Sequence, residues 1–414
     1  MESCDWSLPT TRTAKRFLRG TQRAHEPEET LSRLLPRLES FGITRVADVT
    51  GLDCIGIDTV MVVRPNARSV SVSQGKGSSL AAAKVSGLME SIEQYHAERV
   101  AGPLQYCGAR ELSGRHRIVD TSLLPKFARP FSATDRILWT RGIELLDARE
   151  TWLPFELVHL DLRLPLPPGS GHFLSGSNGL ASGNVEAEAM GHALCELVER
   201  DALTLFFDLS AEEQVARRVD LSSIDDPVCQ ELLDKYRTAG VEVAVWNATS
   251  DVGVACFVCW ILDADVDGFR QTGLAQGAGC HPDRCIAMAR ALTEAAQSRL
   301  TRVVGSRDDM NSGEIESLVA DTPRHRAAMA HRSLSMRFED VQSDAAPSFE
   351  EDLAFITRRL ESVGIRSVVV VDLSMQPGLH VVRVVVPGLE PPYYLPGYRP
   401  GRRALAARAA RSPS

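Results

Sequence analysis

Two helix-favouring segments, far apart in the sequence, place glutamates among apolar side chains. The segments read LMESIEQYHAE and EAMGHALCELVER. Helical geometry puts Glu90 and Glu93 about 60° apart on one face of the first segment. It puts Glu188, Glu196 and Glu199 within an arc of about 80° on the second. Carboxylates are seldom buried without partners, so the glutamate-bearing faces of the two helices are either exposed to solvent or share bound cations.

Amphipathic helices with their glutamates in solvent are the plain interpretation of this pattern. However, each helix follows a turn rich in glycine and serine, QGKGSS in one case and SGSNGLASGN in the other. If the two faces meet, five carboxylates cannot all stay charged without cations, because like charges repel in a shared site. Mg²⁺ takes oxygen ligands and bridges protein carboxylates to phosphates. The pattern therefore leaves two interpretations open, namely glutamates that face solvent and a shared Mg²⁺–nucleotide site.

The bulk properties exclude several classes of protein. The 414 residues are 44% hydrophobic and carry a formal net charge of -8, which does not favour nucleic-acid binding. No apolar run approaches the roughly 20 residues that a membrane span needs, and the N-terminus lacks the apolar segment of a signal peptide. Nine cysteines, an odd number, favour a reducing cytoplasm over a disulfide framework.

The alternation of helix and strand patterns predicts an α+β (mixed α/β) domain. We expect a loosely ordered N-terminus at 1–20 and one catalytic domain over 21–400, with a polar surface insertion at 305–350. One of the expected strands spans 172–176. The basic residues 401–414 are expected to form a flexible tail, and deletion from Arg402 onward is expected to leave activity nearly unchanged.

Lys76 lies in a sequence, GKG, that differs from a nucleotide-binding P-loop, because Gly77 stands where that motif needs serine or threonine. A lysine at a helix start still favours anion binding.

A zinc site was considered at four cysteines. The spacing C-x2-C is present once, but the segment VACFVCWIL reads as a buried strand, where positions three apart point to opposite faces. We therefore expect no zinc site at Cys256, Cys259, Cys280 and Cys285.

Three motifs in a fixed order carry a resemblance to a known family. The first, S-x3-E-x2-E, is Ser86, Glu90 and Glu93. The second and third contribute Asn184, Glu188, Glu196, Glu199, Arg200, Gln297 and Arg302. With these residues the sequence resembles the YcaO-domain family, ATP-dependent enzymes that activate peptide-bond amides, over roughly residues 14–400.

The resemblance implies the fold of that family, with sheets flanked by the carboxylate-bearing helices around an ATP and Mg²⁺ site. It implies that the five glutamates hold Mg²⁺ around the ATP phosphates. It also implies nucleotide or metal contacts for Ser86, Asn184, Arg200, Gln297 and Arg302. Arg23 and Thr30 occupy positions where relatives use lysine and serine near the nucleotide.

Some positions depart from the family pattern, and they point to one branch. Ala181, His192 and Gln94 stand where other residues are common, and the chain lacks the Pro-x-Pro-x-Pro ending of azoline-forming members. Residues 42–77 resemble instead the branch that works with TfuA-like partner proteins. That branch is associated with backbone thioamides.

The implied function is phosphorylation of a backbone amide oxygen by ATP, forming a thioamide on a ribosomally made peptide or protein. The partners are then a TfuA-like protein and a sulfur donor, and a homodimer is compatible with the sequence. No catalytic nucleophile of the enzyme is needed. Two alternatives stay open: an azoline-forming cyclodehydratase acting on Cys, Ser or Thr of a precursor peptide, and a non-catalytic ATP-binding accessory protein.

Overall fold

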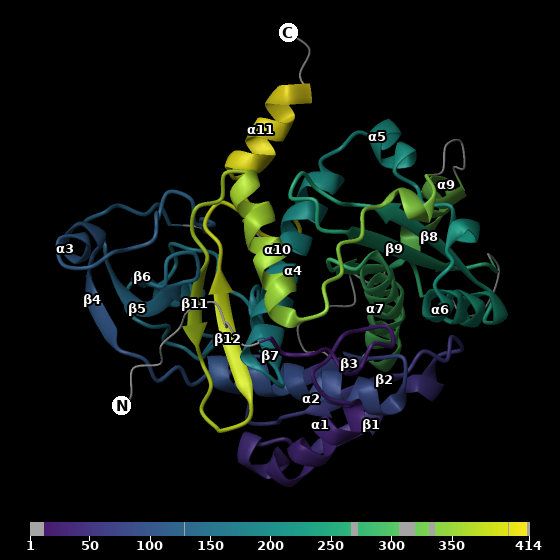
Figure 1. The fold of residues 1–414 in the computed structure, drawn as a ribbon, viewed down its shortest axis with the longest axis horizontal. Coiled ribbons are helices and arrows are strands. Elements are labelled where there is room, and N and C mark those ends of the chain that lie inside the picture. Colours follow the sequence, from purple (N-terminus) through teal and green to yellow (C-terminus); the bar gives the residue numbers. More distant parts are fainter. Residues whose placement is uncertain are drawn as a thin grey trace. The chain divides into compact units, whose positions relative to one another are not determined.

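The chain folds into two compact units, each assembled from separated segments (Figure 1). Unit 1 takes residues 1–14, 92–208 and 346–414, and unit 2 takes residues 15–91 and 209–345. Because neither unit is continuous, no linker in the sequence marks their boundary. The computed structural model describes residues 12–127, 129–265, 272–305, 319–330, 336–395 and 397–411. Most of the expected loosely ordered N-terminus lies outside the described residues.

Unit 1 is built on an antiparallel six-stranded sheet. Its strands follow the order β4-β5-β11-β12-β7, and β6 pairs with β5. The inner strands β11 and β12 consist largely of valine, whose branched side chain suits a pleated sheet. The strands are β4 (Leu104–Gly108), β5 (Arg136–Glu144), β6 (Glu150–Pro154), β7 (Leu180–Gly183), β11 (Val369–Asp372) and β12 (His380–Val385).

The central helix of unit 1 is α4, which follows β7 after a short turn and packs against β7 and β12. Helices α10 and α11 pack against α4 in turn. Most of α4 is buried, including Glu188 and Glu199. The helical segments are α3 (Ala109–Ser113), η3 (Phe155–Leu157), α4 (Glu186–Phe207), α10 (Phe349–Ser362) and α11 (Arg402–Arg411).

Unit 2 contains two antiparallel three-stranded sheets, β1-β2-β3 and β10-β9-β8. Helix α7 (Arg284–Val304) lies directly on β10, because a Cβ at Gly277 would stand 2.2 Å from the backbone nitrogen of Ala295. Only glycine allows such an approach of helix to strand. The strands are β1 (Arg45–Asp48), β2 (Thr59–Val63), β3 (Val72–Lys76), β8 (Val241–Asn247), β9 (Cys256–Asp263) and β10 (Ala275–Cys280).

Helix α2 (Leu80–Ala97) packs on β3 through a second glycine contact. A Cβ at Gly75 would stand 2.1 Å from the carbonyl oxygen of Ala83, so the GKG sequence serves close packing of backbone on backbone. The boundary between the units, at residue 91, falls within α2. The remaining helical segments of unit 2 are α1 (Pro27–Leu34), η1 (Leu35–Phe41), η2 (Thr50–Leu52), α5 (Ala211–Ala216), η4 (Leu221–Ser223), α6 (Pro227–Thr238), α9 (Thr322–Ala330) and η5 (Phe338–Asp340).

The expected surface insertion at 305–350 contributes to the core of unit 2. Phe338 is fully buried, and its ring lies 5.8 Å from that of Phe257 on β9. Val341 belongs to the same apolar cluster. Residues 306–318 and 331–335 of this segment lie outside the described residues.

The cysteines of β9 are core residues. Cys256 and Cys259 are buried, and burial raises the pKa of the Cys259 thiol far above its usual range. Within the described ranges no cluster of cysteines or other side chains is spaced to hold a metal ion.

The C-terminal helix α11 is held on α4 by ion pairs. Arg403 donates to the two carboxylate oxygens of Asp201 at 2.8 and 3.0 Å, and Asp201 is fully buried. Arg408 pairs with Asp208 at the end of α4 at 2.6 Å. The structure therefore has a helix at Arg402–Arg411, within the segment 401–414 that the sequence analysis expects to be a flexible tail. The partners of these arginines lie far back in the sequence, where no local pattern identifies them.

A buried carboxylate completes this attachment. Glu390 accepts hydrogen bonds from the backbone N–H groups of Gly401 and Ala404 at 2.8 and 2.9 Å, and from the hydroxyl of Tyr398 at 3.1 Å. It thereby satisfies N–H groups at the start of α11 that have no partner within the helix.

We expect Arg403→Met to lower the free energy of unfolding by about 3–5 kcal/mol, because Asp201 would stay buried without its charged partner. Urea denaturation measures this loss, and Arg402→Met, at an exposed neighbouring position, is the matched control. Deletion from Arg402 onward is expected to destabilise unit 1 as well, in contrast to the sequence-based expectation. Equal stability of Arg403→Met and wild type would contradict the importance of this ion pair.

A second prediction concerns His159, whose ring stacks on Phe155 at 4.6 Å. Burial lowers the pKa of His159 to about 4, although Asp161 opposes the shift. An unfolded histidine takes up its proton near pH 6.5, so the free energy of unfolding should fall between about pH 6.5 and pH 4, by at most about 3 kcal/mol from this residue.

In His159→Gln the loss of stability between pH 8 and pH 5 should be about 2 kcal/mol smaller than in wild type. Urea titrations at the two pH values measure this difference. The free energies of unfolding at pH 8, where the histidine is neutral in both states, give the separate cost of losing the stacking contact. An unchanged difference between pH 8 and pH 5 would show that His159 does not contribute to acid sensitivity.

Candidate functional site

The glutamates of unit 1 come from α2 and α4. Glu93, on α2, accepts a hydrogen bond of 2.6 Å from the hydroxyl of Ser182 on β7. Glu188 and Glu199, on α4, are only 4% and 3% exposed. Burial of this kind is rare for glutamate unless it is paired or holds a cation. Glu90, one turn earlier on α2, belongs to unit 2.

Arg200 lies beside the carboxylates at the middle of α4. Its guanidinium is 3.4 Å from Glu199 and 3.9 Å from Glu196. The arginine therefore offsets part of the negative charge on this helix.

The turn between β7 and α4 positions Glu188. The amide nitrogen of Asn184 is 3.4 Å from both carboxylate oxygens of Glu188, a long contact for a hydrogen bond. A Cβ at Gly183 would stand 2.6 Å from the backbone nitrogen of Ala189, so this position requires glycine. The strand can therefore pass directly into the helix that carries the glutamates.

Arg383 on β12 is a residue of this region that sequence reasoning missed. It is fully buried, and burial lowers its pKa to about 10, while the negative charges of Glu196 and Glu93 oppose that shift. The signal in the sequence was a single arginine within the apolar run HVVRVVV.

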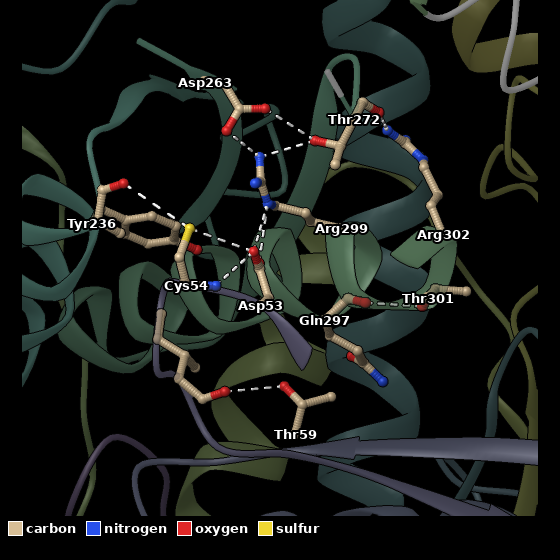
Figure 2. A network of polar contacts seen from close by, with 12 residues as sticks. Asp53, Cys54, Thr59, Tyr236, Asp263, Thr272, Gln297, Arg299, Thr301 and Arg302 are labelled. Carbon is tan, nitrogen blue, oxygen red and sulfur yellow. Dashed lines mark hydrogen bonds and ion pairs between the residues drawn. The ribbon is translucent and has the colours of Figure 1, made fainter. Parts of the chain in front are cut away.

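In unit 2, the third motif lies on α7 and encloses another missed arginine (Figure 2). Between Gln297 and Arg302, the buried Arg299 pairs with Asp53 at 3.0 Å and with Asp263 at 2.9 Å. Thr272 accepts a further hydrogen bond from it at 2.8 Å. This network fixes the part of α7 that carries the motif.

Arg302 is anchored to the backbone near the start of β10. One guanidinium nitrogen donates to the carbonyl of Leu274 and, at 3.3 Å, to that of Thr272. Burial lowers the pKa of Arg302, and the charge of Arg299 acts in the same direction. Gln297 accepts from the Thr301 hydroxyl through its backbone carbonyl at 2.8 Å (Figure 2).

Lys76, at the end of β3, forms an ion pair with Glu294 on α7. Ser86 lies on the part of α2 that belongs to the same unit and is partly buried. Both predicted residues are therefore in unit 2 together with Gln297 and Arg302.

Three positive charges of unit 2 act on His281. Burial, together with the charges of Lys15, Arg290 and Arg23, lowers the pKa of His281 well below its usual range. Arg23 was predicted from the sequence, whereas the other three residues were not. Thr30, also predicted, is a buried residue of α1.

The four expected metal ligands of unit 1 are engaged with other side chains. The carboxylates of unit 1 contact Ser182, Asn184 and Arg200. In the part of the chain that the structure describes, no three side chains of His, Cys, Asp or Glu are spaced to hold a metal ion. The donors nevertheless fit Mg²⁺ in kind, since carboxylate oxygens are its preferred protein ligands.

Residues 74–390 match the model of the YcaO cyclodehydratase family, which is described as binding ATP and Mg²⁺. The chain belongs to the YcaO family. A protein in the tfuA 3′ region of Rhizobium leguminosarum bv. trifolii is 36% identical over 375 residues, covering 89% of this chain and 88% of its own. This relative agrees with the resemblance to the TfuA-associated branch.

Two solved structures share the fold. A heterocyclase in complex with substrate and cofactor has a TM-score of 0.75 and 24% identity; the match covers 92% of this chain and about half, 54%, of the heterocyclase. YcaO from Methanopyrus kandleri, bound with AMPPCP and Mg²⁺, has a TM-score of 0.72 and 22% identity, with 91% and 95% covered. The predicted α+β YcaO fold is thereby confirmed.

The cofactors of this YcaO protein are ATP and Mg²⁺, as the sequence predicted. Members of the family are ATP-dependent peptide-modifying enzymes. Within the described ranges, no helix has the length and apolar character needed to cross a membrane.

We expect Glu199→Gln to weaken Mg²⁺-dependent ATP hydrolysis, because one buried negative charge is lost while the side-chain volume is kept. The apparent Mg²⁺ affinity should fall by about 10–100-fold. A titration of ATPase activity with Mg²⁺ measures this, and Glu361→Gln, on the exposed end of α10, is the control. An unchanged Mg²⁺ requirement would exclude Glu199 as a metal ligand.

Proposed function

We propose that this YcaO protein replaces the oxygen of a peptide backbone amide with sulfur, using ATP. The observation that carries the proposal is the 36% identical relative in the tfuA 3′ region, which covers nearly the whole chain. Residues 42–77, which resemble the TfuA-associated branch, support the same assignment.

The proposed roles follow the chemistry of the side chains. Carboxylate oxygens hold Mg²⁺, and guanidinium and amide groups neutralise or orient phosphate oxygens. The metal ligands are Glu90, Glu93, Glu188, Glu196 and Glu199. The nucleotide contacts are Arg23, Thr30, Lys76, Ser86, Asn184, Arg200, Gln297 and Arg302.

The reaction is a substitution at a carbonyl carbon whose oxygen is a poor leaving group. A sulfide equivalent adds to the carbon, and the resulting oxyanion takes the γ-phosphoryl group of ATP. The C–O bond then breaks, so that inorganic phosphate leaves and the C=S bond forms; ADP is the second product. The protein has to position the groups and offset phosphate charge, and no enzyme nucleophile is needed.

The proposed partners are a peptide or protein substrate, a TfuA-like protein and a sulfur donor. The reaction is assigned to the reducing cytoplasm, in keeping with the free cysteines of the described chain. A homodimer remains compatible with this scheme.

A second candidate function is azoline formation, in which a Cys, Ser or Thr side chain of the substrate is the nucleophile. The name of the matching family and the fold shared with a heterocyclase favour it.

Mass spectrometry of a precursor peptide encoded beside the gene tests the two functions. The peptide is incubated with the full chain, a TfuA-like protein, ATP, Mg²⁺ and sulfide. Thioamide formation raises the peptide mass by the difference between sulfur and oxygen, whereas azoline formation lowers it by one water. We expect the increase, and we expect Glu199→Gln to reduce it when Mg²⁺ is limiting.

Loss of water in the absence of sulfide would overturn the proposal in favour of the cyclodehydratase. ATP binding without ATP turnover or any change of peptide mass would favour an accessory protein.

A further inference from the structure

Arg383 lies in the interior of the unit 1 sheet, where arginine is rare. It is on β12, which pairs with β11 on one side and β7 on the other. Its side chain is among the largest that are fully buried. A guanidinium keeps its positive charge in such a place, and burial of a charge is costly unless the surroundings compensate it.

Backbone carbonyls hold this guanidinium. One terminal nitrogen donates to Gly176 at 2.8 Å and to Asn178 at 2.9 Å, and the other donates to Val158 at 3.2 Å. In the described part of the chain, no carboxylate lies within ion-pair distance of Arg383. The hydrogen bonds therefore fix the turn at 176–178 without neutralising the charge.

The register of the sheet places Arg383 beside the acidic residues. Ser182 on β7 is opposite Val381, and Arg383 is two residues further along β12, so Ser182 and Arg383 point to the same face. Ser182 donates to Glu93 at 2.6 Å, which brings that carboxylate to this face. The negative charges of Glu93 and Glu196 act on Arg383 and partly compensate its burial.

Two arginines of unit 1 act on these glutamates. Arg200 pairs with Glu196 and Glu199 along α4. Arg383 is the second cation, and the negative charges of Glu196 and Glu93 act on it. The other two glutamates of the proposed metal set in this unit are Glu93, which accepts from Ser182, and Glu188, which contacts Asn184.

We propose that Arg383 is a positioning residue that makes divalent-cation binding by these glutamates depend on the nucleotide. Its fixed positive charge opposes binding of a bare divalent cation, whereas the phosphates of ATP bring enough negative charge to overcome that repulsion. The inference rests on the proposed role of the glutamates as metal ligands.

Binding of Mn²⁺ to the full chain tests this proposal without any measurement of turnover. The affinity is determined by calorimetry, first without nucleotide and then with AMPPCP. Arg383→Gln keeps two hydrogen-bond donors and removes the charge. Arg383→Lys keeps the charge and removes the planar arrangement of guanidinium donors. Arg383→Met is a second neutral variant in case the first does not fold.

Without nucleotide, Arg383→Gln and Arg383→Met should bind Mn²⁺ at least about tenfold more tightly than wild type, because a repulsive charge is gone. Arg383→Lys should bind like wild type. The matched control is Arg218→Gln, which removes a buried arginine of unit 2 that also donates to a backbone carbonyl. Its Mn²⁺ affinity should equal that of wild type.

The proposal is overturned if the neutral variants and wild type bind Mn²⁺ equally, while wild type still binds Mn²⁺ with AMPPCP. It is also overturned if the Mn²⁺ affinity of Arg383→Lys changes as much as that of Arg383→Gln, because the hydrogen-bond geometry of the guanidinium, rather than its charge, would then determine the affinity. If wild type binds Mn²⁺ neither alone nor with AMPPCP, the glutamate site itself is wrong, and the proposed function fails with it.

Discussion

Burial of carboxylates along α4 is the constraint on which the rest of unit 1 depends. Each charge removed from water needs a cation or a hydrogen-bond donor nearby, and α4 carries such charges over most of its length. Arg200 pairs with Glu199, and Arg403 pairs with Asp201 two residues later. The C-terminal helix likewise returns to α4, where Arg403 pairs with Asp201 and Arg408 with Asp208.

In unit 2, close contact of backbone on backbone holds two helices on the sheets. Glycines on β10 and β3 let α7 and α2 lie against the strands at distances that a side chain would prevent. The buried Arg299 then ties α7 to Asp53 and Asp263. Helix α7 is thus held both by its contact with β10 and by the ion pairs of Arg299, so it has little freedom to rotate. Gln297 and Arg302 therefore keep a defined orientation relative to the sheet.

Local sequence patterns predicted most of the helices and strands. They failed where side chains, rather than a neighbouring strand, accept the hydrogen bonds of the backbone. Residues 172–176 have the pattern of a strand, but the Glu156 carboxylate accepts the N–H groups of His172 and Phe173 at 3.2 and 3.1 Å. That segment therefore forms a loop. The C-terminal segment is a similar case. Its arginines are evident from the sequence, but only the fold places Arg403 beside Asp201 and Arg408 beside Asp208, where the ion pairs hold α11 on α4.

The sequence by itself determined the family, the cofactors and the faces of the helices, because motif order and helical periodicity are local properties. It brought out Glu188, Glu196 and Glu199 as one acidic face. Tertiary structure alone decided which cations stand beside that face, and it introduced Arg383 from a strand nearly two hundred residues away. The reason is physical: periodicity sets where a side chain points, whereas charge compensation depends on what the fold brings within a few ångströms of it.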